Sequence, residues 1–338
     1  MKRNELILIL NGLVSIIIIA AVLNYVGAGD VLSALYRINF PLLLVSMLFL
    51  FLMDLFMSYR VKILLDHAGS RLSFLDILKS HFVGMLGADF TPARSGYIAT
   101  AGVLHYKYDV PSEKAMVSIL GPQIYDFALK LVAGTLAILY ILYRFIGPQG
   151  GLIIISGSII MALMVGAMIL LLFSQRFLRI FRFAEKVPFI SGIYALFIRM
   201  QENAHIVVSM TPQLLVLMLF SWTAKSVSWY FAAKAVGITV NTEFPEILFY
   251  FFLQPLVTML EFIPTPTIAG LGLSEGGSTL VFSFFGIPAA TAATFALLVR
   301  FKTTFVHLPA VPEALATLRL GDKDKVEKGN AISGEMGA

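Results

Sequence analysis

The sequence predicts an all-α polytopic membrane protein, with six full transmembrane helices and two opposed re-entrant helical hairpins arranged as an inverted-topology repeat. Three observations support this prediction. First, 58% of the residues are hydrophobic and only 13% are charged, whereas about 25% are charged in soluble globular proteins. Second, the apolar runs are about 20 residues long, which suits membrane-spanning helices and not the alternating strands of outer-membrane barrels. Third, two further apolar stretches are broken by matching proline motifs.

Six apolar runs are long enough to cross a hydrocarbon core of about 30 Å. They cover residues 6–26, 41–59, 115–143, 151–173, 212–236 and 290–312. The first run follows Lys2 and Arg3, as a signal peptide would. It is long enough to span and no small-residue cleavage site follows it, so we expect a retained first helix.

Two further stretches, 80–104 and 246–286, are interrupted at Pro92 and Pro264. Proline has no amide proton and blocks the preceding helical turn, so the backbone must leave the helix there. Each remaining arm has about 10–17 residues, which is short for a span. Irregular backbone at membrane depth is tolerated only where it is buried in protein or lines a wet cavity. We therefore expect each stretch to form a re-entrant hairpin.

The basic residues predict the orientation of these elements. Most of the 25 Lys and Arg residues fall in the segments assigned to the cytoplasm, which are 1–5, 60–79, 105–114, 174–211 and 313–338. The segments assigned to the outside hold only Arg37 and Arg144, and they are 27–39, 144–150, 237–245 and 286–289. This asymmetry follows the positive-inside rule. It places both termini in the cytoplasm and predicts a multi-pass protein of the cytoplasmic membrane.

The same orientation predicts an internal repeat. Repeat one, about 6–143, runs span, span, hairpin, span, and repeat two, about 151–312, runs the same way in the opposite direction. Both lie in one transmembrane domain, 1–320. The connector 174–211 interleaves basic and aromatic residues, which suits either an amphipathic helix on the cytoplasmic leaflet or a plain connector. The polar tail 321–338 is expected to be disordered.

The two helix breaks carry the same pattern of an acidic residue, Phe, any residue and Pro, beginning at Asp89 and at Glu261. Matching breaks in the two halves of a transporter indicate the substrate site. Arg94 follows the first break, and an arginine beside the free amide protons of a half-helix is suited to phosphate. The alternative is that Arg94 only pairs with Asp89 or Glu261 and joins the hairpins. The candidate substrate-binding residues at the breaks are Asp89, Thr91, Pro92, Arg94, Ser95, Gly96, Glu261, Pro264, Pro266, Gly270, Gly272 and Glu275.

Three further charged residues in predicted spans complete the candidate site. Asp126 and Lys130 are four residues apart and can pair on one helix face. Asp126 lies nearly as far beyond Pro92 as Arg300 lies beyond Pro264. Asp126 and Arg300 are therefore potential pseudosymmetric mates, and either Lys130 or Arg300 can be the partner of Asp126. Such charges are costly in a membrane and usually functional.

Other intramembrane charges have simpler interpretations. Glu275 stands in the first turn of a half-helix, where it can cap the helix or contact substrate. Lys234 and Lys302 lie toward the ends of their segments and are expected to snorkel to the interface. Asp54 is expected to face a cytoplasmic vestibule.

Several kinds of site are not predicted. The chain has no phosphate-binding loop of the nucleotide-hydrolase type, and its five histidines lack the spacing of metal ligands. No Ser-His or paired-aspartate catalytic signature stands out. We therefore expect neither a cofactor nor a metal, no nucleic-acid partner, and no enzymatic activity.

At these motifs the sequence resembles the transmembrane region of lysylphosphatidylglycerol synthases, a family of flippase-like (YbhN-type) integral membrane proteins. The resemblance covers about residues 6–315. It rests on Thr91-Pro92-Ala93-Arg94-Ser95-Gly96, Asp126, Pro264-Thr265-Pro266, Gly270-Leu271-Gly272, Glu275 and Arg300. One departure is that Thr267-Ile268-Ala269 separates the prolines from the glycines, which in the family follow directly.

The resemblance implies a flippase or transporter that moves a polar, phosphate-bearing lipid head group through a cavity between the hairpins. Because the chain ends soon after its last predicted span, we expect it to lack the soluble aminoacyl-transfer domain of the full synthases. The expected partners are membrane lipids with a phospholipid or polyprenyl-phosphate head group. The protein partner can also be a second copy of the chain, in a homo-oligomer, or a soluble lipid-modifying protein. The alternative functions are an integral membrane lipid-modifying enzyme and an accessory subunit of a lipid or glycan synthesis system.

Overall fold

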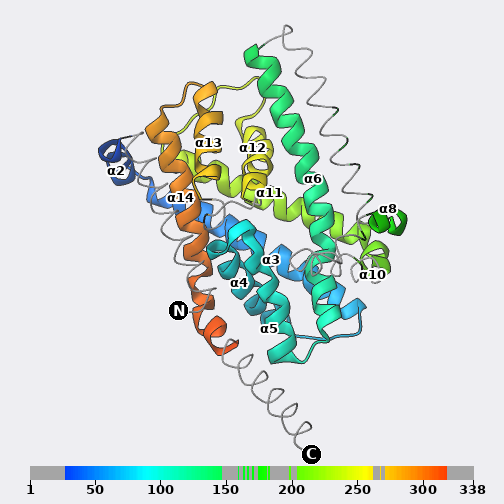
Figure 1. Ribbon diagram of the computed structural model, residues 1–338. Helices are drawn as coiled ribbons and strands as arrows, with labels where there is room; N and C mark the ends of the chain where they lie inside the picture. The colour runs from blue at the N-terminus through cyan, green and yellow to red at the C-terminus, as the bar shows by residue number, and fades with distance from the viewer. Residues whose placement is uncertain are drawn as a thin grey trace, which may run out of the picture.

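The computed structural model describes residues 27–146, 174–180, 204–261 and 271–317, together with the single positions 159, 163, 166, 170, 182, 198 and 267. Every regular element in this part of the chain is helical (Figure 1). The elements are α2 (Ala28–Tyr36), α3 (Phe40–His67), α4 (Phe74–Phe90), η1 (Pro92–Ile98), α5 (Ala99–Tyr108), α6 (Ser112–Ile146), α8 (Gln175–Ile180), α10 (Ala204–Ser209), α11 (Thr211–Ala235), α12 (Glu246–Leu260), α13 (Leu273–Phe284), α14 (Ala289–His307) and η5 (Leu308–Ala310).

Four described helices are long and apolar enough to cross a membrane. They are Phe40–His67, Ser112–Phe145, Thr211–Ala235 and Ala289–Thr317, and they correspond to four of the six predicted spans. The predicted span 6–26, the tail 321–338 and most of the span 151–173 and of the connector 174–211 lie outside the described residues. The all-helical membrane class is therefore confirmed.

The first predicted helix break is present between α4 and η1. The backbone is extended at Thr91, with φ −117° and ψ 145°, and η1 then folds back along α4. Gly87 and Gly96 allow this close approach, since a Cβ on Gly96 would lie 2.2 Å from the carbonyl carbon of Gly87. The Thr91 hydroxyl accepts a hydrogen bond from the Gly96 amide at 2.6 Å and donates one to the Gly87 carbonyl at 2.9 Å.

A second break separates α12, which ends at Leu260, from α13, which begins at Leu273. Gly272 precedes α13 with φ +91°, a left-handed conformation that favours glycine. The predicted site residues Pro264, Pro266 and Gly270 lie in the part of this connection outside the described residues.

Helices α3 and α11 form the most extensive contact between described elements. At their crossing the hydroxyls of Ser46 and Ser228 each donate to the other residue's carbonyl, at 2.6 and 2.7 Å. Small residues at such a crossing let two backbones approach closely. Lys302 of α14 inserts here and donates to the Ser228 carbonyl at 3.0 Å and to both serine hydroxyls.

The expectation that Lys302 snorkels is wrong, because its side chain is fully buried and only 1% of the residue is exposed. Its three oxygen partners replace the water that an ammonium would otherwise need. Lys234, at the end of α11, is partly exposed and pairs with Glu246 at 2.6 Å. Only Lys234 therefore keeps its charge near the surface.

The contacts between helices come in matched sets. Helix α3 packs on α4 as α11 packs on α12, and α5 packs on α6 as α13 packs on α14. Likewise α6 contacts α12, and α14 contacts α4. Arg94, which follows α4, contacts Glu261, which follows α12, so the ends of these two helices meet.

Candidate functional site

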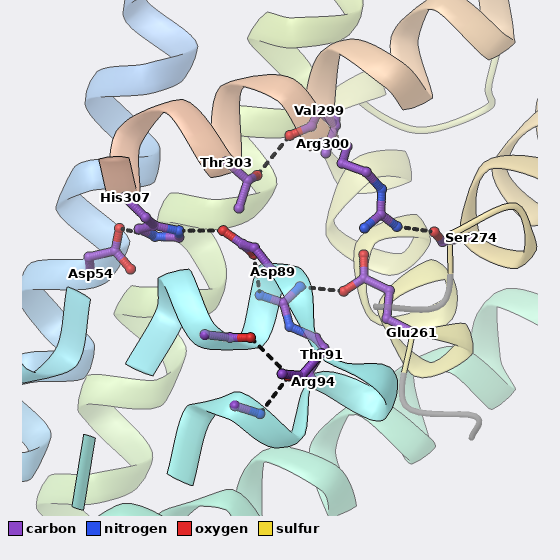
Figure 2. A network of polar contacts seen from close by, with 12 residues as sticks. Asp54, Asp89, Thr91, Arg94, Glu261, Ser274, Val299, Arg300, Thr303 and His307 are labelled. Atoms are coloured by element: carbon purple, nitrogen blue, oxygen red, sulfur yellow. Dashed lines mark hydrogen bonds and ion pairs between the residues drawn. The ribbon is translucent and has the colours of Figure 1, made fainter. Parts of the chain in front are cut away.

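Arg94 joins the two helix breaks directly. One guanidinium nitrogen, Nη1, donates to Glu261 Oε2 at 2.6 Å, and the other, Nη2, donates to Asp89 Oδ1 at 3.3 Å (Figure 2). All three side chains are largely buried. The guanidinium is therefore held between an acid of its own hairpin and an acid of the other. This is the pairing that the sequence left open as the alternative role of Arg94.

The local backbone conformation places the Arg94 side chain between Asp89 and Glu261. The residue has φ +53°, an uncommon left-handed conformation for a residue with a side chain. It follows Thr91, whose hydroxyl ties the turn to both Gly87 and Gly96. Strain of this kind persists only where the surroundings hold it, and it is frequent at binding sites.

Asp89 carries the polar contacts further into the protein. Its second oxygen, Oδ2, lies 2.8 Å from Nδ1 of His307, and Nε2 of His307 lies 3.3 Å from Oδ2 of Asp54 (Figure 2). The other Asp54 oxygen lies 3.1 Å from Nε2 of His81. Asp54, His81 and His307 are completely buried. The expectation that Asp54 faces a cytoplasmic vestibule is therefore wrong.

Glu275 and Arg300 form a second polar cluster beside the bridge. The Glu275 carboxylate accepts from the Gly272 amide at 2.6 Å, which caps α13, and from Arg300 Nε at 2.5 Å. Arg300 Nη2 also donates to the Ser274 hydroxyl at 2.9 Å. The capping role proposed for Glu275 from the sequence is therefore present.

Of its two candidate partners, Asp126 pairs with Lys130, which is the nearer in the sequence. Lys130, one turn along α6, donates to it at 2.8 Å. Arg300 is held by Glu275 and Ser274 instead, so the pseudosymmetric pairing of Asp126 with Arg300 is wrong. Fixed spacing on one helix made the Lys130 pair available without any tertiary requirement.

A cavity of about 260 Å³ lies on one side of the Arg94–Glu261 bridge. Residues of α3, α4, η1, α6, α11 and α12 line it. Its charged lining residues are Arg94, Asp126, Lys130, Lys225 and Glu261, and its apolar wall includes Met53, Met57, Met85, Phe127 and Trp222. Among the described residues, Lys225 forms no hydrogen bond and no close ion pair, although Glu261 and Asp126 lie near enough to attract it.

Two further cavities adjoin this region. A small one of about 30 Å³ lies on the other side of the bridge and is lined by Asp89, Arg94, Glu261, Glu275 and Arg300 among others. The third is almost entirely apolar, has about 410 Å³, and follows the contact between α6 and α12. Arg94 and Glu261 line both polar cavities, so their ion pair forms the wall between them.

The predicted site residues divide into three groups. Those that line the larger polar cavity are Arg94, Ser95, Asp126, Lys130 and Glu261, and those that line the small one include Asp89, Glu275 and Arg300. Thr91, Pro92, Gly96 and Gly272 shape the two helix ends instead. The sequence did not assign Lys225, Asp54, His81 or His307 to the site. Lys225 stood out only as an intramembrane charge, and no spacing signal connected the histidines to the aspartates.

Within the described residues, no group of three or more His, Asp or Glu side chains is arranged to hold a metal ion.

Comparison with protein families matches residues 8–310 to the family described as lysylphosphatidylglycerol synthase TM region. The chain belongs to this family. The match covers nearly all of the sequence, and it confirms the family that the helix-break motifs indicated. A comparison with curated proteins found no match. Membership associates this transmembrane domain with membrane lipids.

A double-mutant cycle measures how strongly Arg94 and Glu261 depend on each other. Arg94→Met leaves Asp89 and Glu261 buried without a shared cation, which should lower the free energy of unfolding by about 3–5 kcal/mol. Adding Glu261→Gln to the Arg94→Met variant should restore part of the lost free energy of unfolding, because one uncompensated charge is removed. Reversible unfolding in detergent measures each free energy.

The exposed pair of Arg144 with Glu243 provides the matched control. Arg144→Met should change the free energy of unfolding by less than about 1 kcal/mol. Strictly additive effects of Arg94→Met and Glu261→Gln would contradict the bridge.

Proposed function

We propose that the protein is a lipid flippase or transporter that moves a phosphate-bearing head group through the cavity beside the Arg94–Glu261 bridge. The observation that carries the proposal is the cavity itself. It brings together Lys225, an ammonium with no close partner among the described residues, and the guanidinium of Arg94. An anionic group entering there would accept charge-assisted hydrogen bonds from Lys225 and Arg94.

The cavity is large enough for a head group. Its volume of about 260 Å³ compares with about 30 Å³ for a water molecule in the liquid. Arg94 and Lys225 suit the phosphate, while Asp126 and Glu261 suit cationic or hydroxylated parts of a head group. The bound group would lie in a site with both signs of charge.

The adjoining apolar cavity suits an acyl or prenyl chain. Both cavities follow the same contact between α6 and α12. On α6 the polar lining ends at Lys130 and the apolar lining begins at Leu136, which corresponds to about 9 Å along a helix. Phe252 and Leu256 continue the apolar lining on α12. A polar end joined to an apolar end describes a lipid.

We propose that transport uses an inverted repeat, with six spans, two re-entrant hairpins and both termini in the cytoplasm. The matched helix contacts of the two halves support it. Two ion pairs support the orientation. Arg144 and Glu243 come from two segments assigned to the outside, and Lys107 and Glu313 come from two assigned to the cytoplasm. Rocking of one repeat against the other would expose the cavity to each leaflet in turn.

A lipid-modifying enzyme, or an accessory subunit that recruits one, is the alternative and would use the same cavity. Family membership is compatible with both. A chemically altered lipid after incubation with the purified chain would favour the enzyme, and a co-purifying soluble synthetase would favour the accessory subunit. Unaltered lipid that changes leaflet favours the transporter.

The orientation can be tested by cysteine labelling, because the chain contains no cysteine. Glu243→Cys should react with a membrane-impermeant maleimide on intact cells. Asp66→Cys, in the segment 60–79, should react only after the membrane is opened. Labelling of Glu243→Cys from the cytoplasmic side alone would overturn the topology.

The site can be tested with Lys225→Met, which removes the ammonium and keeps the length of the side chain. Hydrogen bonds to charged groups contribute about 1.5–3 kcal/mol, so transport of fluorescent phosphatidylglycerol in proteoliposomes should fall by about 10- to 100-fold. Dithionite quenching of the outer leaflet measures the transport rate.

Lys234→Met is the matched control, since Lys234 lies on the same helix but pairs with Glu246 away from the cavity. Its transport rate should stay within about twofold of the wild type. Equal rates for Lys225→Met and wild type, with both proteins folded, would remove the proposed site.

A further inference from the structure

We propose that the buried chain Asp89–His307–Asp54–His81 binds an exchangeable proton, and that Arg94 links this proton to the anionic head group in the cavity. The protein would then be a proton-coupled transporter. This inference rests on the proposed function of the cavity. Its evidence, however, lies in a different group of residues, which the cavity does not contain apart from the shared Arg94.

His307 shows where this chain can take up a proton. Both of its ring nitrogens face carboxylates, Nδ1 toward Asp89 and Nε2 toward Asp54. A neutral imidazole has one donor and one acceptor nitrogen, so its acceptor would face a carboxylate lone pair. Favourable contacts on both sides require either a protonated imidazole or a protonated carboxylate. The proton is shared among three groups that are shielded from water.

His81 is the neutral end of the chain. Its Nε2 faces Asp54, whereas its buried Nδ1 has no hydrogen-bond partner. A second proton on this ring would create a buried N–H without an acceptor. The Arg60 guanidinium of α3 also lies near enough to repel a positive charge on His81. The exchangeable proton is therefore confined to Asp54, His307 and Asp89.

Arg94 connects this proton to the cavity. It donates to Asp89 with Nη2 and to Glu261 with Nη1, and its side chain lines the cavity wall. The contact with Asp89 is the longer of the two, at 3.3 Å against 2.6 Å. An anion in the cavity would compete with Asp89 for the guanidinium. Asp89 would then lose part of its stabilising charge and bind a proton more tightly.

The sign of the coupling follows from the charges that surround Asp89. Arg94 on η1 and His307 on α14 contact it directly, and Asp54 on α3 lies beyond His307. Glu261 after α12, Glu275 on α13 and Arg300 on α14 line the small cavity together with Asp89. Because a bound anion adds negative charge to this set, it favours protonation. Linkage is reciprocal, so protonation must strengthen anion binding by the same factor. Anion binding should therefore take up protons and become tighter as the pH falls.

The experiment uses the full chain in detergent with short-chain dioctanoyl phosphatidylglycerol as the probe. An indicator dye in weak buffer measures proton uptake on binding, and fluorescence titration measures the Kd at pH 5.5 and pH 8. Wild type should take up as much as one proton per lipid. Its Kd should rise with pH, by up to about tenfold per unit for one linked proton.

Asp89→Asn is the decisive variant, because asparagine imitates a permanently protonated aspartate. It should abolish proton uptake and bind the lipid at pH 8 about as tightly as wild type does at pH 5.5. A purely structural role for Asp89 predicts the opposite, which is weaker binding at every pH. Asp66→Asn, at the exposed end of α3, is the matched control and should keep the wild-type pH dependence.

The outcomes separate this inference from the proposed function. If wild type binds phosphatidylglycerol without proton uptake and with one Kd at both pH values, the proton site is overturned and the lipid site stands. If wild type binds no phosphatidylglycerol at either pH, the proposed function fails and the inference fails with it. The wild-type measurement decides between these results even if Asp89→Asn does not fold.

Discussion

The structure depends on one buried guanidinium shared by two carboxylates. In each half of the chain a helix ends shortly before a proline of the sequence, and an acidic residue at each helix end lies in the interior. Neither Asp89 nor Glu261 could remain ionised there alone, because an unpaired charge at membrane depth costs several kcal/mol. Arg94 satisfies both and thereby fixes the two breaks against each other. The two polar cavities share Arg94 and Glu261 as lining residues.

The ion pairs of Arg94 with Asp89 and Glu261 lie between two different polar environments. On one side is a cavity with cations and a methionine-rich wall, and on the other is a chain of buried aspartate and histidine side chains. A residue that contacts both can transmit a change in one to the other without any large motion. Energetic coupling of this kind requires only that each ligand alters the charge that the other meets. The proposed transport and its proton dependence are therefore two consequences of one contact.

The sequence predicted the features that depend on local physics. Hydropathy located the four described spans, the two proline motifs indicated where α4 and α12 end, and fixed helix spacing indicated the Asp126–Lys130 pair. Local capping likewise accounted for Glu275. The partners of Asp54, His81 and Lys302 could not be predicted, because they come from other helices. Which buried charge meets which depends on helix packing, and a single sequence does not specify that packing residue by residue.

The most direct test of the central claim is an electron cryomicroscopy structure of the protein in nanodiscs that contain phosphatidylglycerol. The account predicts density for a phosphate within hydrogen-bond distance of both Lys225 and Arg94, with an acyl chain along the contact of α6 with α12. It also predicts that the distance between Arg94 and Asp89 increases relative to the lipid-free protein. Lipid bound only on the outer surface of the helices, with the cavity empty and the bridge unchanged, would contradict it.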